Sequence, residues 1–315
     1  MKKVLITGGY GFIGSHTVDL FLKNDFHVTV VDNLTTGRVE NLHHLKPYQN
    51  PLLLACKDEF DSFRILSEIR SGKFDYVLHF AANASVPYSV ERPVETNQIN
   101  LTKTISLLDA CRVGRVKKCV FSSSSAVYGN CAKFPTNELE EIHPLSPYAL
   151  QKLLVEQYCK LFYQLYGLES ISLRYFNVFG PRQAGSGPYA NVISSWCEQG
   201  IRNNKIRLDG EGKAYRDFIH VSDIAKANLL AVISDIKFGC YNVGSGVSVQ
   251  ISELLRYFKT YFGNIEVINA PTREGDPERT QADIRLIQKD FGFSPSIVTE
   301  DMFYNTIKWY KENIK

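Results

Sequence analysis

The sequence predicts an α/β protein: a Rossmann-type, doubly wound parallel sheet joined to a smaller mixed α/β lobe. Short apolar, strand-like runs alternate with helical patterns through the first 174 residues, as they do in successive βαβ units. A glycine-rich turn follows the first run directly, at the first strand–helix junction. Beyond Arg174 the chain becomes rich in Gly, Pro, Asn and aromatic residues, which indicates a loop that leaves the sheet.

Six strands of the large sheet are expected in chain order. They are the short, mainly apolar runs 3–7, 27–32, 52–56, 76–80, 118–122 and 170–174. A helical pattern separates the first two runs, with apolar residues at Ile13, Val18, Leu20, Phe21 and Leu22. Because each helix between two strands returns the chain to the same edge of the sheet, we expect the strands to pair in parallel.

A long helix is expected to start near Tyr148. One apolar stripe contains Leu150, Leu153, Leu154, Leu161 and Leu165, and an adjacent stripe contains Val155, Cys159, Phe162 and Tyr166. A helix that is apolar on two sides is expected to be buried on two sides. One side would face the sheet. The other would pack against the rest of this chain or against a second copy, and we predict a homodimer formed through the helices near 100–112 and 148–166.

The two expected domains are not separated at a single position in the sequence. We expect residues 1–174 to form a Rossmann domain, with 217–245 returning to it. Residues 175–216 and 246–315 are expected to form the smaller lobe, which would bind substrate.

The composition excludes several classes of protein. The net charge is +3, and the 36 basic and 33 acidic residues are interspersed, so no nucleic-acid partner is expected. The first apolar stretch meets glycines after four residues, too soon for a signal segment or a membrane span. The seven cysteines are scattered without a Cys-x-x-Cys pair, which predicts reduced thiols in a cytoplasm and no metal site.

The glycine-rich turn predicts a dinucleotide site. Gly8, Gly11 and Gly14 are spaced three apart, which suits a tight turn, a close approach of backbone to a pyrophosphate, and helix–strand packing. Phe12 and Ile13 open the following helix, whose free N–H groups and positive dipole end favour phosphate. A plain tight turn is the alternative interpretation of these glycines.

An acidic residue ends the second strand. Asp32 follows Gly14 by eighteen residues, where a carboxylate can bind a ribose diol and repel a 2′-phosphate, so NAD is predicted rather than NADP. Asn33 is expected to assist it, and Asp58, after the third strand, is a candidate partner for the adenine amino group. The alternatives are a turn cap for Asp32 and a solvated loop residue for Asp58.

The most informative stretch joins a serine cluster, 122–125, to Tyr148 and Lys152. On a helix, residues four apart lie on one face, one turn apart. An ammonium near a phenol favours the phenolate and lowers a pKa that starts near ~10. The spacing therefore predicts that Tyr148 is a general base near neutral pH, beside a cofactor that can accept hydride.

These motifs together resemble the extended short-chain dehydrogenase/reductases. The matching segments are 7–14 (TGGYGFIG), 79–82 (HFAA), 121–129 (FSSSSAVYG), 146–152 (SPYALQK), 173–182 (LRYFNVFGPR), 215–223 (YRDFIHVSD) and 273–276 (REGD). The likeness spans essentially the whole chain. It is to the NAD-dependent epimerase/dehydratase family that acts on nucleotide sugars, and within it to the UDP-glucose/UDP-N-acetylglucosamine 4-epimerases.

The resemblance assigns roles around the cofactor. It implies that Tyr148 and Lys152 are the catalytic pair and that Ser124, which shares a strand face with Ser122, hydrogen-bonds the reacting hydroxyl. Phe80 and Ala81 are expected to line NAD, Ala81 through its backbone, and Tyr175 to pack near the nicotinamide or serve as a core aromatic.

The resemblance also implies a set of substrate contacts. These are Asn177 and Arg216 at the nucleotide diphosphate, Arg273 at a phosphate or the ribose, Asp276 near the uridine ribose, Ser85 at the border of the sugar, and Thr280 beside the sugar C2 substituent. For several of them an interpretation without substrate binding stays open: a loop cap for Ser85, and surface charges for the two arginines and Asp276. Because Thr280 is small, the resemblance implies that an N-acetyl group is admitted there.

The expected reaction is NAD-dependent 4-epimerisation of a UDP-hexose through a 4-keto intermediate. The expected substrates are UDP-N-acetylglucosamine and UDP-N-acetylgalactosamine, with UDP-glucose and UDP-galactose as further candidates. A 4,6-dehydratase is disfavoured because Ser125 and Ala126 occupy the positions where such enzymes have an Asp-Glu pair. The remaining alternatives are a UDP-glucuronate 4-epimerase or decarboxylase, a nucleotide-sugar reductase, and a non-catalytic NAD(H)-binding sensor.

Overall fold

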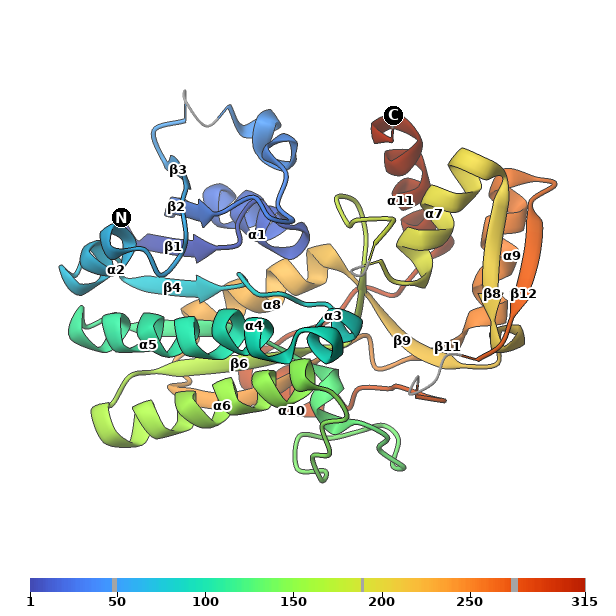
Figure 1. The fold of residues 1–315 in the computed structure, drawn as a ribbon. Coiled ribbons are helices and arrows are strands. Elements are labelled where there is room, and N and C mark those ends of the chain that lie inside the picture. Colours follow the sequence, from blue (N-terminus) through green and yellow to red (C-terminus); the bar gives the residue numbers. More distant parts are fainter. Residues whose placement is uncertain (47–49, 188–189, 273–276, 315) are drawn as a thin grey trace.

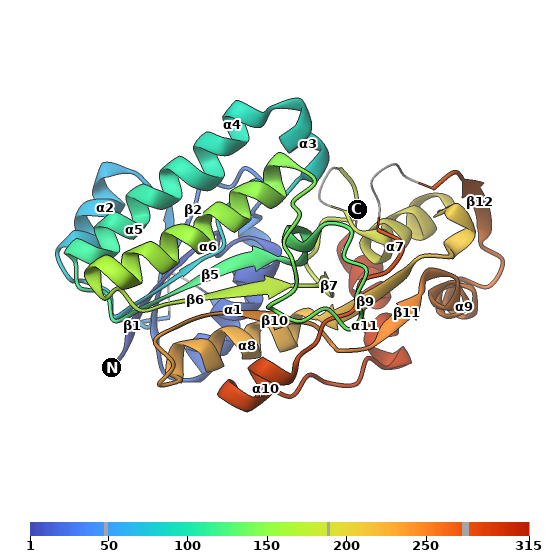
Figure 2. The same ribbon diagram turned by 90° about the horizontal axis from the view of Figure 1, so that it is seen from below.

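A computed structural model describes residues 1–46, 50–187, 190–272 and 277–314. Figures 1 and 2 show a large three-layer α/β part, with a smaller lobe beside it that contains the C-terminal helix. The predicted fold class is confirmed, because a parallel sheet covered by helices on both faces is joined to small mixed sheets.

The large sheet has seven strands among the described residues, in the order β10-β6-β5-β4-β1-β2-β3. Every neighbouring pair is parallel. The strands are β1 (Lys3–Thr7), β2 (His27–Asp32), β3 (Leu53–Lys57), β4 (Tyr76–His79), β5 (Lys118–Ser124), β6 (Ser170–Tyr175) and β10 (Phe238–Val243). The order reverses between β1 and β4, the switch point where open α/β sheets bind ligands.

Strand β5 is two residues longer than the sequence pattern indicated. It continues to Ser124 because it keeps pairing with β6, with Ser123 opposite Arg174 and Ser124 opposite Tyr175. The polar serines gave no apolar signal for these last two residues. Their inclusion in the strand holds the serine cluster at the carboxyl edge of the sheet.

Helices cover both faces of the large sheet (Figure 2). One layer contains α1 (Phe12–Lys23), α8 (Val221–Ile233) and α10 (Arg285–Phe291), and the other contains α2 (Phe63–Arg70), α4 (Pro93–Asn97), α5 (Lys103–Val113) and α6 (Pro147–Tyr166). Helix α3 (Val86–Glu91) contacts α4 and α6. The alternation of strand residues divides the buried core into two clusters, one under each layer.

Helices α4 and α5 are continuous through a π-helical turn, Gln98–Thr102. The residues at both of its junctions keep right-handed helical backbone angles. Single π-turns of this kind locally change which side chains face inward. Here Asn100 is buried and donates to Gln151 Oε1 of α6 at 2.8 Å.

The smaller lobe has its own aromatic core around Trp196, Phe258 and Phe303. Its helices are α7 (Val192–Asn203), α9 (Ile251–Phe262) and α11 (Glu300–Asn313). Strands β8 (Lys205–Asp209) and β12 (Glu266–Ala270) form one sheet, and β7 (Asn177–Phe179), β9 (Tyr215–His220) and β11 (Ser248–Gln250) form another. The chain therefore rejoins the large sheet at α8, after β9 has paired within the smaller lobe.

No helix within the described ranges is both long and apolar enough to cross a membrane.

Candidate active site

The start of α6 is specified by its sequence. Ser146 caps the helix by accepting from the N–H of Ala149 at 3.2 Å, and Pro147 occupies the first turn, where its missing N–H costs nothing. The helix ends at Gly167, whose φ of 70° suits a residue without a side chain. This start places Tyr148 and Lys152 on the first two turns.

We call Ser122, Ser124, Tyr148 and Lys152 the Ser–Tyr–Lys corner. The Lys152 ammonium donates to the Ser122 carbonyl oxygen at 2.7 Å and to Ser122 Oγ at 3.3 Å. It lies 5.8 Å from the centroid of the Tyr148 ring. Tyr148 is 9% exposed and Lys152 8%, so both polar groups are almost withdrawn from water. The spacing of four residues brings the pair together as predicted.

Burial governs the protonation of both groups. It raises the pKa of Tyr148, and a hydrogen bond with Ser124 acts in the opposite direction. Burial lowers the pKa of Lys152 to about 8, against the attraction of the Glu156 carboxylate. Burial and Ser124 are the causes of the shift at Tyr148, so the low pKa that the spacing from Lys152 suggested stays a prediction.

The serines at the end of β5 have different partners. Ser122 donates to the His79 carbonyl oxygen at 3.2 Å, and Ser123 donates to Glu156 Oε1 at 2.5 Å. The Ser124 hydroxyl oxygen accepts from the N–H of Ala126 at 3.2 Å, and Ser124 is the serine whose side chain lowers the pKa of Tyr148. Ser124 stays the predicted serine beside the reacting group.

The glycine turn fits a pyrophosphate. Gly8 has a φ of +69°, and a Cβ there would lie 2.7 Å from the Ala81 nitrogen. A Cβ on Gly14 would overlap the Gly8 carbonyl oxygen. Gly11 caps α1 without a side chain, so the first-turn N–H groups of Phe12 and Ile13 meet no side-chain cap. A close backbone turn that leads into a helix N-terminus is the arrangement that binds dinucleotides.

Asp32 lies beside this turn. Its carboxylate accepts from the N–H of Tyr10 at 3.0 Å and of Leu34 at 2.8 Å, and burial raises its pKa. Asn33 donates to Glu59 at 3.0 Å. Asp58 accepts from Ser62 at 3.0 Å and Arg64 at 3.2 Å. Asp32 thus caps a turn, which was the alternative interpretation, and its binding of a ribose stays a prediction.

The other expected cofactor residues lie at the carboxyl ends of β4 and β6, which are separated in the sheet by β5. Phe80 and Ala81 follow β4 and are tied to Thr7 through their backbone N–H groups. Tyr175 ends β6 and packs in the core, with its hydroxyl donating to Asn228 at 2.6 Å. Ser85 is buried and caps α3 by accepting from the N–H of Tyr88, the loop-cap interpretation of this residue.

Three expected substrate residues come together in the smaller lobe. Asn177 donates to Thr280 Oγ1 at 3.0 Å and to the Asp217 carbonyl oxygen at 3.3 Å. Arg216 is buried and donates to the carbonyl oxygens of Tyr215 and Glu278. Arg216 is therefore not an exposed surface charge. The expected contacts Arg273 and Asp276 lie outside the described residues.

Asp217 binds four donors and holds this region together. Its carboxylate accepts from Ser245 N and Oγ, both at 2.7 Å, from Gly246 N at 3.0 Å and from Ala282 N at 2.9 Å. Burial nevertheless raises its pKa to about 6. In the sequence, Asp217 is the acidic neighbour of Arg216, and no separate role was predicted for it.

Sequence reasoning also missed a buried network behind the corner. Glu156 lies four residues beyond Lys152 on α6 and forms an ion pair with Arg174 of β6, with Nη2 to Oε2 at 2.7 Å. The repeated spacing of four from Tyr148 to Lys152 to Glu156 was the available signal. Arg174 carried no comparable signal, because its partner depends on how β6 packs against α6.

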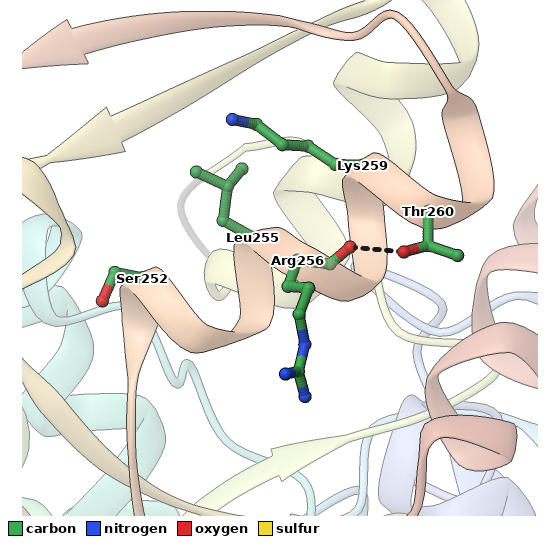
Figure 3. A pocket seen from close by; sticks show the side chains of 5 residues that line it. All are labelled: Ser252, Leu255, Arg256, Lys259 and Thr260. Atoms are coloured by element: carbon green, nitrogen blue, oxygen red, sulfur yellow. Dashed lines mark hydrogen bonds between the residues drawn. The ribbon is translucent and has the colours of Figure 1, made fainter.

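Neither a metal site nor the hollow on α9 is supported as a second functional site by the described residues. In the part of the chain that the structure describes, no three His, Cys, Asp or Glu residues gather as metal ligands, and all seven cysteines are unpaired. A hollow of about 450 Å³ on α9 is lined by Ser252, Leu255, Arg256, Lys259 and Thr260. Figure 3 shows that these side chains all come from one helix and point in different directions, so they converge on no common point.

Known proteins support the same interpretation. The sequence model of the NAD dependent epimerase/dehydratase family matches residues 4–244. A putative UDP-glucose 4-epimerase from Methanocaldococcus jannaschii is 37% identical over 312 residues, which cover 98% of this chain and 99% of that protein.

Solved structures agree over nearly the full length. A UDP-N-acetylglucosamine 4-epimerase from Methanobrevibacter ruminantium, in complex with UDP-N-acetylmuramic acid, is 40% identical, with a TM-score of 0.93 and 99% of both chains covered. A UDP-glucose 4-epimerase from Thermus thermophilus, in complex with NAD, is 34% identical, with a TM-score of 0.87 and coverage of 99% and 100%. The chain therefore belongs to the NAD-dependent epimerase/dehydratase family, as the glycine turn and the Ser–Tyr–Lys motif predicted.

Proposed function

We propose that the protein is an NAD-dependent 4-epimerase of a UDP-hexose. The observation that carries this proposal is the meeting of Ser124, Tyr148 and Lys152 at the carboxyl edge of the sheet, beside the glycine turn. The relatives support it, since they are named as UDP-glucose or UDP-N-acetylglucosamine 4-epimerases.

NAD is the proposed cofactor. Gly8, Gly11 and Gly14 would hold its pyrophosphate, Phe12 and Ile13 would offer backbone donors, and Asp32 would bind the adenosine ribose. Asn33, Asp58, Phe80, Ala81 and Tyr175 remain proposed contacts of lesser weight. When bound, NAD+ accepts a hydride from the sugar C4 and returns it. A carboxylate at Asp32 disfavours the extra phosphate of NADP.

In the proposed mechanism, Tyr148 removes the proton from the sugar C4 hydroxyl while the C4 hydrogen leaves as hydride. The hydrogen bond from Ser124 favours the phenolate and orients the sugar hydroxyl. The Lys152 ammonium stabilises negative charge at the phenol oxygen and can bind the nicotinamide ribose. The 4-keto sugar then turns, and Tyr148 gives the proton back as hydride returns to the opposite face of C4.

The smaller lobe is proposed to hold the nucleotide while the hexose turns. Arg216 offers a buried cation, and Asn177 offers a half-buried polar side chain that bonds the carbonyl oxygen of the next residue, Asp217, which suits a diphosphate. Arg273, Asp276 and Ser85 remain proposed substrate contacts from the family resemblance. Tight anchoring of the diphosphate and loose anchoring of the hexose would allow the turn that inversion requires.

Thr280 supports a preference for the N-acetyl sugars. Its short side chain lies against Asn177, next to the proposed diphosphate site. By the family resemblance, a small residue at this position admits an N-acetyl group. We therefore propose UDP-N-acetylglucosamine and UDP-N-acetylgalactosamine as substrates, with UDP-glucose and UDP-galactose as further ones.

The proposal is tested by incubating the purified protein with each UDP-sugar, without added cofactor, and following the sugar protons by NMR. We expect the 4-epimer to accumulate to equilibrium and the protein to carry bound NAD, detected after acid release. Turnover of glucose but not of the N-acetyl sugar would overturn the Thr280 argument. Absence of any epimer from all four sugars would overturn the proposed function.

A homodimer through α5 and α6 is also proposed. Leu150, Leu161 and Leu165 are between 45% and 61% exposed along α6, and Val113 of α5 is 45% exposed, so the paired helices present apolar side chains to solvent. Light scattering should give the mass of two chains, and Leu161→Lys should give one. A monomeric parent protein would contradict this proposal.

The division of the chain and its compartment stay proposals. We propose a Rossmann domain of residues 1–174 joined by 221–243, because α8 packs on α1 and β10 pairs with β6. The rest would form the substrate lobe, and limited proteolysis should cut between the two. The seven unpaired cysteines support a reducing cytoplasm, which cell fractionation would test.

A further inference from the structure

One buried ion pair holds both ends of the short segment that contains Ser124. Glu156 of α6 and Arg174 of β6 are 2% and 3% exposed and form two parallel bonds, Nη2 to Oε2 at 2.7 Å and Nε to Oε1 at 2.9 Å. A bidentate pair of this kind fixes the relative position of its two partners more strictly than a single bond does.

Each member of the pair binds one end of the segment 123–128. At the first end, Ser123 Oγ donates to Glu156 Oε1 at 2.5 Å. At the second, Arg174 Nη1 donates to the Tyr128 hydroxyl at 2.8 Å. Tyr128 in turn donates to Asn242 Oδ1 of β10 at 2.7 Å. The residues between these two anchors include Ser124 and the short helical turn Ser125–Tyr128.

The same pair connects the strand to the helix that bears the proposed base. Glu156 lies one turn beyond Lys152 on α6, and β5 and β6 align Ser123 with Arg174. A shift of Ser124 relative to Tyr148 would therefore require breaking a buried, charge-assisted bond. Other polar groups near Arg174 are the Glu138 carbonyl oxygen, at 3.4 Å, and Cys240.

We propose that Glu156 and Arg174 are positioning residues that hold the segment containing Ser124 in place against α6, the helix that carries Tyr148. This inference rests on the proposed function for its kinetic part only. Neither residue touches the substrate in this account. Their effect passes through Ser123 at one end of the segment and Tyr128 at the other.

The test removes each anchor while leaving the ion pair intact, because loss of Glu156 or Arg174 itself could unfold the protein. Ser123→Ala removes the first anchor and Tyr128→Phe the second. Ser170→Ala is a matched control, since Ser170 is also buried and its hydroxyl donates to α6, to the Cys159 carbonyl oxygen at 3.5 Å. Tyr241→Phe removes a comparable tyrosine bond, to Asp290 at 2.9 Å.

We expect Ser123→Ala and Tyr128→Phe to lower kcat roughly tenfold to a hundredfold, with KM for the UDP-sugar unchanged, because misplacement of a catalytic group acts on the chemical step. The two controls should keep the parent kcat. In a Ser124→Ala background, Ser123→Ala should cost nothing further, because the residue that it positions is gone. An equal loss in both backgrounds would show a general structural effect and overturn the proposal.

A second measurement does not depend on turnover. The absorbance of the Tyr148 phenolate is titrated as the difference between each protein and the same protein with Tyr148→Phe. Burial keeps Tyr128 protonated throughout by raising its pKa, so its removal does not disturb the titration. Both anchor variants should raise the apparent pKa of Tyr148, since they weaken its bond with Ser124, and the controls should not.

The two measurements separate the possible failures. A raised pKa of Tyr148 in the anchor variants of a protein that epimerises no UDP-hexose would refute the proposed function and leave the positioning role standing. An unchanged pKa of Tyr148 in both anchor variants would overturn the positioning role, whatever the protein's activity.

Discussion

The Ser–Tyr–Lys corner and the substrate cluster of the smaller lobe bring their residues together over very different distances along the chain. Lys152 bonds Ser122 across 30 positions, and Tyr148 lies on the same helix as Lys152. Asn177 of β7 bonds Thr280, which lies in an irregular segment, across 103 positions. In the first region a helix repeat places the chemistry. In the second, only the assembled fold does.

We therefore expect substitutions in the two regions to alter different properties of the protein. The corner depends on fixed spacing and on buried polar bonds, so small changes should alter the rate of chemistry. The lobe cluster consists of side chains from separate elements, so single changes there should alter which sugar is accepted.

Removal of the proposed base should have the largest effect. Tyr148→Phe keeps the ring and removes the hydroxyl, and kcat should fall roughly 10²–10⁴-fold, the usual contribution of a general acid–base group. Retention of bound NAD, measured after acid release, controls for an intact fold. Full activity in this variant would refute the mechanism.

The buried ion pair should contribute far more to folding than a surface pair. Glu156→Gln leaves Arg174 without its charged partner and should lower the free energy of unfolding by about 3–5 kcal/mol. Glu198→Gln breaks the exposed i,i+4 pair with Arg202, at 3.0 Å, and should cost only about 0.3–0.5 kcal/mol. Urea denaturation measures both, and equal losses would contradict the distinction between the buried ion pair behind the corner and the pair on the surface.

A change in the lobe should act on substrate choice. Thr280→Tyr fills the space proposed for the N-acetyl group, so kcat/KM for UDP-N-acetylglucosamine should fall roughly 10–100-fold relative to UDP-glucose. Thr280→Ser is the matched control, since it keeps the hydroxyl that accepts from Asn177. An equal fall for both sugars would show that Thr280 supports the fold of the cluster and does not select the sugar.

The pH dependence should be the smallest effect. Burial lowers the pKa of Lys152 to about 8, so kcat should decline above pH about 8 as the ammonium loses its proton. Lys118 provides a control, because it is also buried on β5 and its pKa is also lowered by burial, but it lies at the opposite end of the strand. Lys118→Arg should leave the alkaline limb in place, whereas a parent kcat that stays constant well above that pH would contradict the role of Lys152.

Much of the large sheet, the glycine turn and the Ser–Tyr–Lys corner was predictable from local sequence patterns. The strand runs, the three glycines and the spacing of Tyr148 from Lys152 each depend on a repeat that a short stretch of sequence shows. Ser124 was harder to choose among four serines, and the partners of Ser122 and Ser123 distinguish it in the structure. The pKa of Tyr148 could not be predicted from spacing, because burial depends on the whole fold.

The lobe was predictable only through family resemblance. Nothing near Asn177 indicates a bond to Thr280, and the four donors to the Asp217 carboxylate come from three residues distant in sequence. For the Glu156–Arg174 pair, one partner was predictable from a local pattern and the other was not. The position of Glu156 on α6 follows the helix repeat, whereas its partner depends on the packing of β6.

The central claim is that the corner removes and returns the same hydrogen at the sugar C4. The most direct measurement is epimerisation of UDP-N-acetylglucosamine in D₂O without added cofactor, followed by NMR of the C4 proton. The account predicts a 4-epimer that keeps its full C4 proton signal, because the hydride never exchanges with solvent. Incorporation of deuterium at C4 would contradict it and would point to removal of this hydrogen as a proton.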